Sequence, residues 1–293
     1  MGDRSRIWVS LSAALLAGTA LGGPLAAAPF KDMDGLKAGS GPLHFVADHE
    51  GGEGGEGGEG AEKKAAEGGE GGEGGEGGGN AADAGDTVAY FTQLSLIRGH
   101  LFVGMELYRL GAVEHARTHM KHPQDEIYAT LLPAIKARKH DDFGHELDEL
   151  SELMEDRASV NKAMGEFAEI EEAIDDAWEE SDDVTLGTRL WVVHQLVKIA
   201  ADEYAEGVKD GAVVNGHEYQ DAWGFVQITK QIVTTLSASE RARAPEAVET
   251  VKAQLAALDG AWPSVVPPER VSTDASVLYG AAARIEIATL SVD

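Results

Sequence analysis

The chain has no cysteine among its 293 residues, and this absence limits the chemistry open to it. Disulfides and thiolate metal ligands are both excluded, so the stability of the folded part must come from packing. Any transition metal must instead be held by imidazole, carboxylate or thioether groups.

Basic residues are also few. Against 51 aspartates and glutamates the chain has 24 lysines and arginines, which gives a formal net charge of -27. Nucleic acids and anionic lipid surfaces both attract basic proteins, so we expect neither as a partner. The acidity is compatible with bound cations, with a basic protein partner, or simply with solubility.

Several catalytic and metal-binding motifs are missing as well. The chain contains neither the His-Glu-x-x-His motif of zincin proteases nor the Glu-x-x-His motif of ferritin-like di-iron proteins. It also lacks Cys-x-x-Cys-His, a glycine-rich phosphate loop and a nucleophile elbow. The sequence therefore favours a binding protein over an enzyme, and a histidine–carboxylate metal enzyme stays open as a third option.

The first 85 residues differ in character from the rest of the chain. Arg4 and Arg6 precede an apolar run over 7–22, and small residues follow it, which is typical of an export signal over residues 1–28. Residues 29–85 contain a repeated Gly-Gly-Glu period that cannot bury a core, so we predict a disordered acidic linker. We therefore expect a periplasmic or secreted bacterial protein with no membrane span after the signal is cleaved.

Residues 86–293 carry the signals of an all-α domain, an antiparallel helical bundle with short turns. Asp86 is the predicted N-cap of a helix that ends near Gly111, and a second helix follows it. Because proline disfavours helical geometry in the residue before it, we predict a break at Pro123 and an interruption at Pro133. Further helices are predicted within 142–178 and over 186–209, 217–236, 240–258 and 274–290.

Histidines concentrate in the first two of these helices. Four of the chain's ten histidines lie between His100 and His122. Two of them, His115 and His119, are four residues apart and therefore share one helix face. If the two helices pair antiparallel about the turn between them, facing residues have numbers that sum to about 223. This register places His100 opposite His122 and near His119 and Glu126.

The register predicts a metal site in this helix pair. Adjacent helix positions point about 100° apart, so Met120 is not expected to share the site of His119. The ligand atoms should therefore be nitrogen and oxygen rather than sulfur. Imidazole suits iron, copper and zinc, of which we place iron or copper first. The histidines could instead be packing or pH-sensing groups in a non-metal acidic interaction protein of the cell envelope. The predicted ligands are His100, His119, His122 and Glu126, with His115 as an alternative.

A stretch in the second half resembles a known family. Residues 191–225 read as a helix, a turn and a second helix, in which Asn215 is the predicted N-cap and Glu218 completes a capping box. This stretch is similar to the periplasmic helical region attached to some bacterial high-affinity iron permeases. The similarity lies in a helix with an acidic-Tyr pair, in the Gly-x-Val-x-Asn turn that starts at Gly211, and in the Glu-Tyr pair that ends at Tyr219. The resemblance implies a soluble helical protein that presents metal to a permease.

Imelysin-type periplasmic iron-uptake proteins, also exported and helical, are a more distant comparison. Their His-x-x-Glu motif is absent, and its nearest analogues are His122-x-x-Asp125 and His145-x-x-Asp148. The sequence thus predicts an exported protein that binds a transition metal and buffers or delivers it, with a membrane metal permease or another envelope protein as partner. The candidates for a secondary metal site are Glu203, Glu218, His194 and His217.

Overall fold

The computed structural model describes residues 86–292, and this part of the chain is mostly helical, as predicted. The predicted export signal and acidic linker lie outside the described residues. Within the described part, no helix is both long and apolar enough to cross a membrane. The elements are α2 (Thr87–Arg109), α3 (Val113–His122), the π-helical turn η2 (Pro123–Tyr128), α4 (Ala129–Arg138), α5 (Gly144–Glu155), α6 (Val160–Glu180), α7 (Leu186–Gly207), β1 (Val208–Lys209), β2 (Ala212–Val213), α8 (Gly216–Thr234), α9 (Ala238–Arg243), α10 (Pro245–Ala257) and α11 (Ala275–Thr289).

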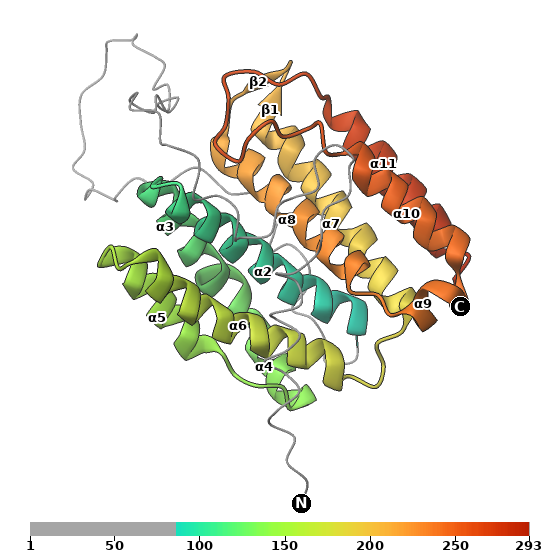
Figure 1. The fold of residues 1–293 in the computed structure, drawn as a ribbon, viewed down its shortest axis with the longest axis horizontal. Coiled ribbons are helices and arrows are strands. Elements are labelled where there is room, and N and C mark those ends of the chain that lie inside the picture. The colour runs from blue at the N-terminus through green and yellow to red at the C-terminus, as the bar shows by residue number, and fades with distance from the viewer. Residues whose placement is uncertain (1–85, 293) are drawn as a thin grey trace, which may run out of the picture. The chain divides into compact units, whose positions relative to one another are not determined.

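Helix α2 lies between two groups of helices. Figure 1 shows α3 to α6 on one side of it and α7 to α11 on the other, and α2 contacts α3, α6, α7 and α8. The helix starts as predicted, because the Asp86 side chain accepts a hydrogen bond from Ala89 N at 3.0 Å. Its neighbours bury it on nearly every face, and even Ser95 and His100 are inaccessible to solvent.

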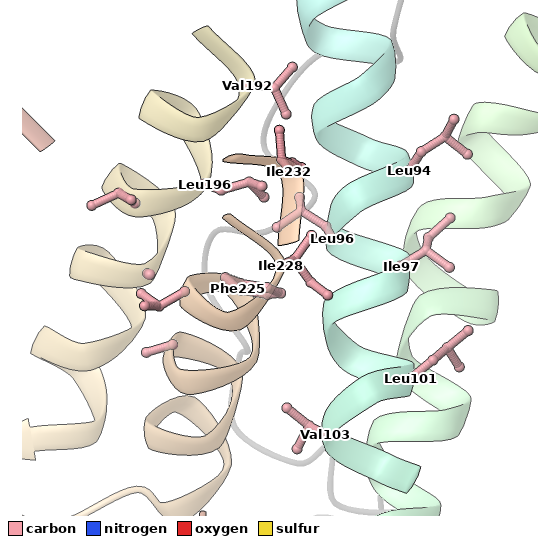
Figure 2. Close-up of a cluster of buried hydrophobic side chains, with 14 of the residues drawn as sticks. Leu94, Leu96, Ile97, Leu101, Val103, Val192, Leu196, Phe225, Ile228 and Ile232 are labelled. Atoms are coloured by element: carbon pink, nitrogen blue, oxygen red, sulfur yellow. The ribbon is translucent and has the colours of Figure 1, made fainter. Parts of the chain in front are cut away.

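The apolar side chains of α2 form two rows that serve the two groups of helices. Figure 2 shows Leu96 and Val103 directed toward α8, whereas Leu94, Ile97 and Leu101 point to the opposite side. All five are essentially inaccessible to solvent. Each such side chain contributes roughly 1.5–3 kcal/mol through burial, so α2 holds both groups of helices in fixed positions.

A short β-hairpin joins α7 and α8. Val208 of β1 pairs with Val213 of β2, and the turn residues Asp210 and Gly211 have positive φ angles of 51° and 74°. Positive φ at both central residues defines a type I′ turn, for which Asp-Gly is a favoured pair. From the sequence we predicted only a turn between two helices, starting at Gly211, and missed this hairpin.

Helix α8 begins at the predicted cap. The Asn215 side chain accepts a hydrogen bond from the backbone N–H of His217 at 3.0 Å. The Glu218 carboxylate accepts a bond from the Asn215 side-chain amide at 3.4 Å. A Cβ on Gly207 would lie 2.7 Å from Tyr219 N, so the end of α7 and the first turn of α8 are in close contact.

Helix α3 ends directly before Pro123, as predicted, but the chain continues in helical form, and the interruption predicted at Pro133 is wrong. At Pro123 the chain passes from α3 into η2 and then α4, and His122 keeps helical angles, with φ -51° and ψ -55°. A π-helical turn changes the hydrogen-bond spacing, which accommodates the missing proline N–H and the bulk of its ring. Pro133 likewise lies inside α4. Because the helix continues, His122 and Glu126 remain on one helical surface.

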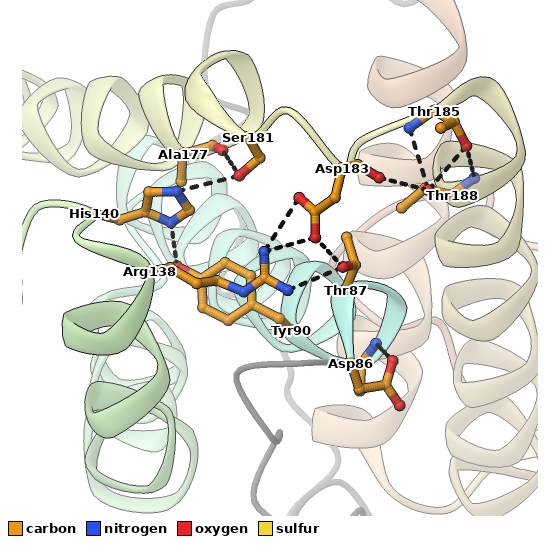
Figure 3. A network of polar contacts seen from close by, with 11 residues as sticks. Asp86, Thr87, Tyr90, Arg138, His140, Ala177, Ser181, Asp183, Thr185 and Thr188 are labelled. Carbon is orange, nitrogen blue, oxygen red and sulfur yellow. Dashed lines mark hydrogen bonds and ion pairs between the residues drawn. The ribbon is translucent and has the colours of Figure 1, made fainter.

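A polar network fixes the N-terminal end of α2 (Figure 3). Arg138, at the end of α4, lies 3.1 Å from Asp183 and donates to the Thr87 hydroxyl at 3.0 Å, and Thr87 in turn donates to Asp183. The Tyr90 hydroxyl lies 2.7 Å from His140 Nδ1. Burial, helped by the positive charge of Arg138, lowers the pKa of His140 and favours its neutral form. The network anchors α2 and therefore the position of His100 along it.

Candidate metal centre

Close backbone contact between α2 and α8 brings a histidine and an aspartate together. A Cβ on Gly224 would lie 2.8 Å from the carbonyl oxygen of Gly99, and a Cβ on Gly99 would lie 2.6 Å from the Phe225 ring. The two helices can approach this closely only because neither glycine has a side chain. His100 follows Gly99, and Asp221 lies one turn before Gly224, so the crossing brings their side chains within hydrogen-bond distance.

A third glycine sets the contact between α2 and α3. A Cβ on Gly104 would lie 2.5 Å from Met120 Cε and 3.2 Å from the carbonyl oxygen of Ala116. The rings of His100 and His122 stack across this helix pair with centroids 4.8 Å apart, as expected from the antiparallel register. Met120 is fully buried against Gly104 rather than beside His122.

Asp221 lies at the centre of a group of imidazoles. Its Oδ1 is 2.8 Å from His100 Nδ1 and 2.9 Å from His119 Nδ1, and its Oδ2 is 3.1 Å from His217 Nδ1. The ring of His122 lies 5.7 Å from that of His217. Donor atoms of His100, His119 and Asp221 all lie within 4.8 Å of one another. Three helices thus place three imidazoles around one carboxylate, and the His122 ring stacks on two of them.

The centre of this cluster is closed to solvent. The side chains of His100, His119 and Asp221 are 0% exposed, whereas that of His217 is 16% exposed. Ligand exchange with solvent would therefore take place on the side of His217.

Gln220 fixes the protonation pattern of His119. The amide nitrogen of Gln220 donates to Val265 O at 3.2 Å, so its amide oxygen faces His119 Nε2 at 3.0 Å. Since that oxygen only accepts, His119 Nε2 carries a proton, and in the neutral ring Nδ1 carries a lone pair. Nδ1 lies 2.9 Å from Asp221 Oδ1, yet it has no hydrogen-bond partner among the described residues. In that neutral form of His119, two electron-pair donors face each other across this contact.

The electrostatics of the cluster favour an ionised aspartate. Burial alone would raise the pKa of Asp221, but its electrostatic interactions with the facing imidazoles of His100, His119 and His217 hold that pKa well below its usual range. Burial lowers the pKa of His217 to about 3, because the attraction of Asp221 is outweighed by desolvation and by the neighbouring imidazoles. A neutral imidazole beside a carboxylate is the form that binds metal.

Three of the predicted ligands lie at the edge of the cluster or outside it. His122 Nε2 is 3.1 Å from Glu126 Oε2, and the Glu126 side chain is 43% exposed. His115 lies one turn before His119 on α3 and is half-buried. It belongs to neither of the converging donor groups found within residues 86–292. His122 thus stacks on two histidines of the cluster, and Glu126 contacts His122.

The residues predicted for a secondary site separate in the structure. His217 joins the central cluster, and with Glu218 and Asp221 it forms a second group of converging donors. His194 instead lies between α7 and α11, with Nδ1 3.2 Å from Ala282 O and its ring edge-on to a tryptophan. Glu203 is buried on α7 and, like His194, belongs to neither donor group in the described part of the chain.

Asp221 and Gln220 were not among the predicted ligands. His217 and Asp221 are four residues apart on α8, the same spacing that singled out His115 and His119 on α3. Applied to the helix predicted over 217–236, the spacing argument would have identified Asp221. Only the three-dimensional contact with α2 and α3 identifies it as the central residue.

A known protein family matches the part of the chain that supplies Asp221 and His217. The family model of the iron permease-associated 4-helix bundle domain matches residues 179–289, which confirms the resemblance of this region to helical domains of iron permease systems. The matched part contains α7 to α11 and supplies Asp221 and His217, whereas His100 and His119 lie on helices that precede it. No curated protein and no solved structure matches the chain.

Proposed function

We propose that the chain binds a transition metal ion, iron first, at His100, His119 and Asp221, and buffers it or delivers it to a membrane iron permease. One observation carries the proposal: His119 Nδ1 and Asp221 Oδ1 lie 2.9 Å apart in a fully buried place without a hydrogen bond between them, and both are electron-pair donors when the His119 ring is neutral. Burying polar atoms without a hydrogen bond between them costs free energy. A bound cation would convert the same contact into two coordination bonds.

The spacing of the donor atoms supports a common ion. Adjacent ligand atoms around an ion with bonds of roughly 2.1 Å are about 3.0 Å apart in octahedral geometry and about 3.4 Å apart in tetrahedral geometry. His119 Nδ1 lies 2.9 Å from Asp221 Oδ1, and His100 Nδ1 donates a hydrogen bond to the same oxygen at 2.8 Å, so an ion bound there would replace the proton of His100 Nδ1. In addition, the hydrogen bond from His119 to Gln220 is the kind of outer contact that orients a metal-binding histidine and fixes its tautomer.

The ligand types argue against copper(I), and the family match favours iron among the metals that imidazole and carboxylate can bind. Imidazole and carboxylate suit iron and zinc, whereas copper(I) prefers sulfur ligands. Met120, the methionine next to His119 in sequence, packs onto Gly104. The family matched by residues 179–289 is described by its association with iron permeases. Zinc suits the same ligands, so the experiment below compares the two metals.

Delivery to a permease is inferred from the family match. We infer that the permease is a separate polypeptide and that the chain meets it in the periplasm. The export signal predicted over residues 1–28 and the acidic linker predicted over residues 29–85 agree with such a role.

A pH-sensing role near neutrality is less well supported. Such a role requires imidazoles that change charge between about pH 5 and 8. Burial lowers the pKa of His217 to about 3, so this ring stays neutral over that range.

The proposal is tested by measuring metal retained by the full chain without an affinity tag. The protein is loaded anaerobically with iron(II), or separately with zinc(II), passed through a desalting column and analysed for metal. We expect retained iron in the wild type. Replacement of two direct ligands in the His119→Ala, Asp221→Asn double variant should weaken binding more than about 100-fold.

His145→Ala is the matched control, because His145 is a surface histidine with its side chain 77% exposed and 3.1 Å from Glu149. This variant should retain as much iron as the wild type. Equal retention by the double variant and the wild type would overturn the proposed site. Stronger retention of zinc than of iron would keep the site and change the metal.

A further inference from the structure

The two oxygens of Asp221 face different histidines. Oδ1 is directed at His100 and His119, while Oδ2 lies 3.1 Å from His217 Nδ1 on the outer side of the cluster. An ion held through Oδ1 therefore leaves Oδ2 available. Oδ2 has no hydrogen-bond partner among the described residues, although the Asp221 side chain is 0% exposed.

His217 is placed to bind an ion through this second oxygen. Neither of its ring nitrogens has a hydrogen-bond partner within residues 86–292, and its ring stacks on that of His119 with centroids 4.2 Å apart. Buried imidazole nitrogens normally have a partner. Donor atoms of His217, Glu218 and Asp221 lie within 4.8 Å of one another, so a second carboxylate is close enough to join them.

We propose that the centre holds two divalent metal ions, the second bound by His217, Glu218 and Asp221, with the Asp221 carboxylate bridging the pair. This inference rests on the proposed function, because the first ion is the one held by His100 and His119. A bridging carboxylate contributes one oxygen to each ion, and paired ions in proteins are typically about 3.5–4 Å apart.

The charges and the burial predict an order of filling. The inner group combines two imidazoles with one carboxylate, and its side chains are 0% exposed. The outer group adds the carboxylate of Glu218, which compensates part of the charge of a second cation, and the His217 side chain is 16% exposed. We expect the inner ion to bind first and the outer ion to exchange more rapidly with solvent.

The stoichiometry of manganese(II) binding tests the second site. The full chain is titrated with manganese(II), and free ion is counted by its electron paramagnetic resonance signal. We expect two tightly bound equivalents in the wild type and a low-temperature spectrum split by spin coupling between the ions. His217→Ala should lower the number to one and remove the coupling, because it deletes an outer ligand and leaves His100 and His119 in place.

Two further variants separate bridging from mere proximity. Asp221→Asn keeps the size of the side chain but weakens both sites, so it should reduce binding at both, whereas Glu218→Gln should affect only the outer ion. His145→Ala serves as the surface control, and circular dichroism checks that each variant is folded. The carboxylates of residues 29–85 are common to all variants and cancel in the comparison.

The outcomes distinguish this inference from the proposed function. One equivalent in the wild type, unchanged in His217→Ala, would overturn the second site and leave the first intact. Two uncoupled equivalents, of which Asp221→Asn removes only one, would overturn the bridge. No tightly bound equivalent of manganese(II), iron(II) or zinc(II) would overturn the proposed function itself.

Discussion

At the scale of the residue, the Asp221 side chain connects three helices through its contacts with their histidines. It is fully buried, and His100 of α2, His119 of α3 and His217 of its own helix all lie within 3.1 Å of its oxygens. A buried carboxylate is costly unless positive charge or donors surround it. Small changes at this residue are therefore expected to affect both stability and metal binding.

The low pKa of His217 predicts a pH dependence of stability for the metal-free protein. Its folded pKa, about 3, lies below the unfolded value of 6.5, so the unfolded chain binds the proton first. Stability is therefore fully present above about pH 6.5 and falls as the pH drops toward 3. Between pH 6.5 and 5 the loss should be about 1–2 kcal/mol.

Urea unfolding at several pH values measures this loss in the wild type and in His217→Gln. Glutamine does not titrate, so the variant should show a flatter dependence between pH 6.5 and 5. Parallel curves for the two proteins would contradict the assignment to His217.

Glycine positions give a second prediction at this scale. Gly224→Ala would place a Cβ 2.8 Å from the carbonyl oxygen of Gly99, so α2 and α8 must separate. We expect a loss of roughly 1–3 kcal/mol of stability, as in other overpacked cores, together with weaker iron binding, because the separation moves Asp221 away from His100.

Gly165→Ala is the matched control for this substitution. Gly165 lies in α6, and a Cβ there meets nothing within 4 Å. Alanine should therefore stabilise the helix by roughly 0.5–1 kcal/mol. Chemical denaturation and metal retention on both variants check the pair, and the idea fails if both substitutions act in the same direction.

At the scale of the element, the β-hairpin fixes how α7 meets α8. Its turn residue Gly211 has a φ of 74°, and a Cβ there would lie 3.0 Å from the carbonyl oxygen of Val271. Gly211→Ala should therefore combine left-handed strain with a steric clash. Gly111 has a similar φ of 81° but open space around it, so Gly111→Ala should cost only the strain, about 1–2 kcal/mol.

Thermal unfolding of the two variants measures the difference. A larger decrease in the midpoint for Gly211→Ala is expected, since only this variant forces the hairpin away from the segment that holds Val271. Equal decreases would mean that the segment around Val271 moves aside without a loss of stability.

The helices and their caps were largely readable from sequence, whereas the contacts between distant segments were not. Asp86 and Asn215 have side chains suited to capping, and each caps the predicted helix. The His100–His122 contact followed from register because a short turn joins the two helices. Asp221 could not be placed beside His100, since the two are 121 positions apart and their contact depends on the glycines of two helices. The π-helical turn at Pro123 was missed because proline rules describe isolated α-helices.

At the scale of the whole molecule, metal binding should stabilise the entire fold. The proposed ligands come from α8, inside the match at residues 179–289, and from α2 and α3, which precede it, so an ion would connect the matched helices to those that precede them. A ligand at 100 times its dissociation constant adds about 2.7 kcal/mol to stability.

The melting temperature should rise when iron(II) is added anaerobically and return to its first value after removal of the metal with a chelator. The His119→Ala, Asp221→Asn double variant should melt at one temperature under both conditions. Hydrogen exchange should slow on loading in α3 and in the first turns of α8. An equal rise in the double variant would place the stabilising ion elsewhere.

The position of Asp221 has a consequence for a chain without cysteine. His100 and Asp221 are 121 positions apart, so an ion held between them would close a long loop of chain in the way that a disulfide does. Unlike a disulfide, this crosslink would open without any redox reaction, as soon as the cargo is handed over. The metal-loaded and the metal-free protein would then differ in rigidity as well as in bound metal. The proposed permease partner could distinguish the two forms by how readily α3 moves away from α8.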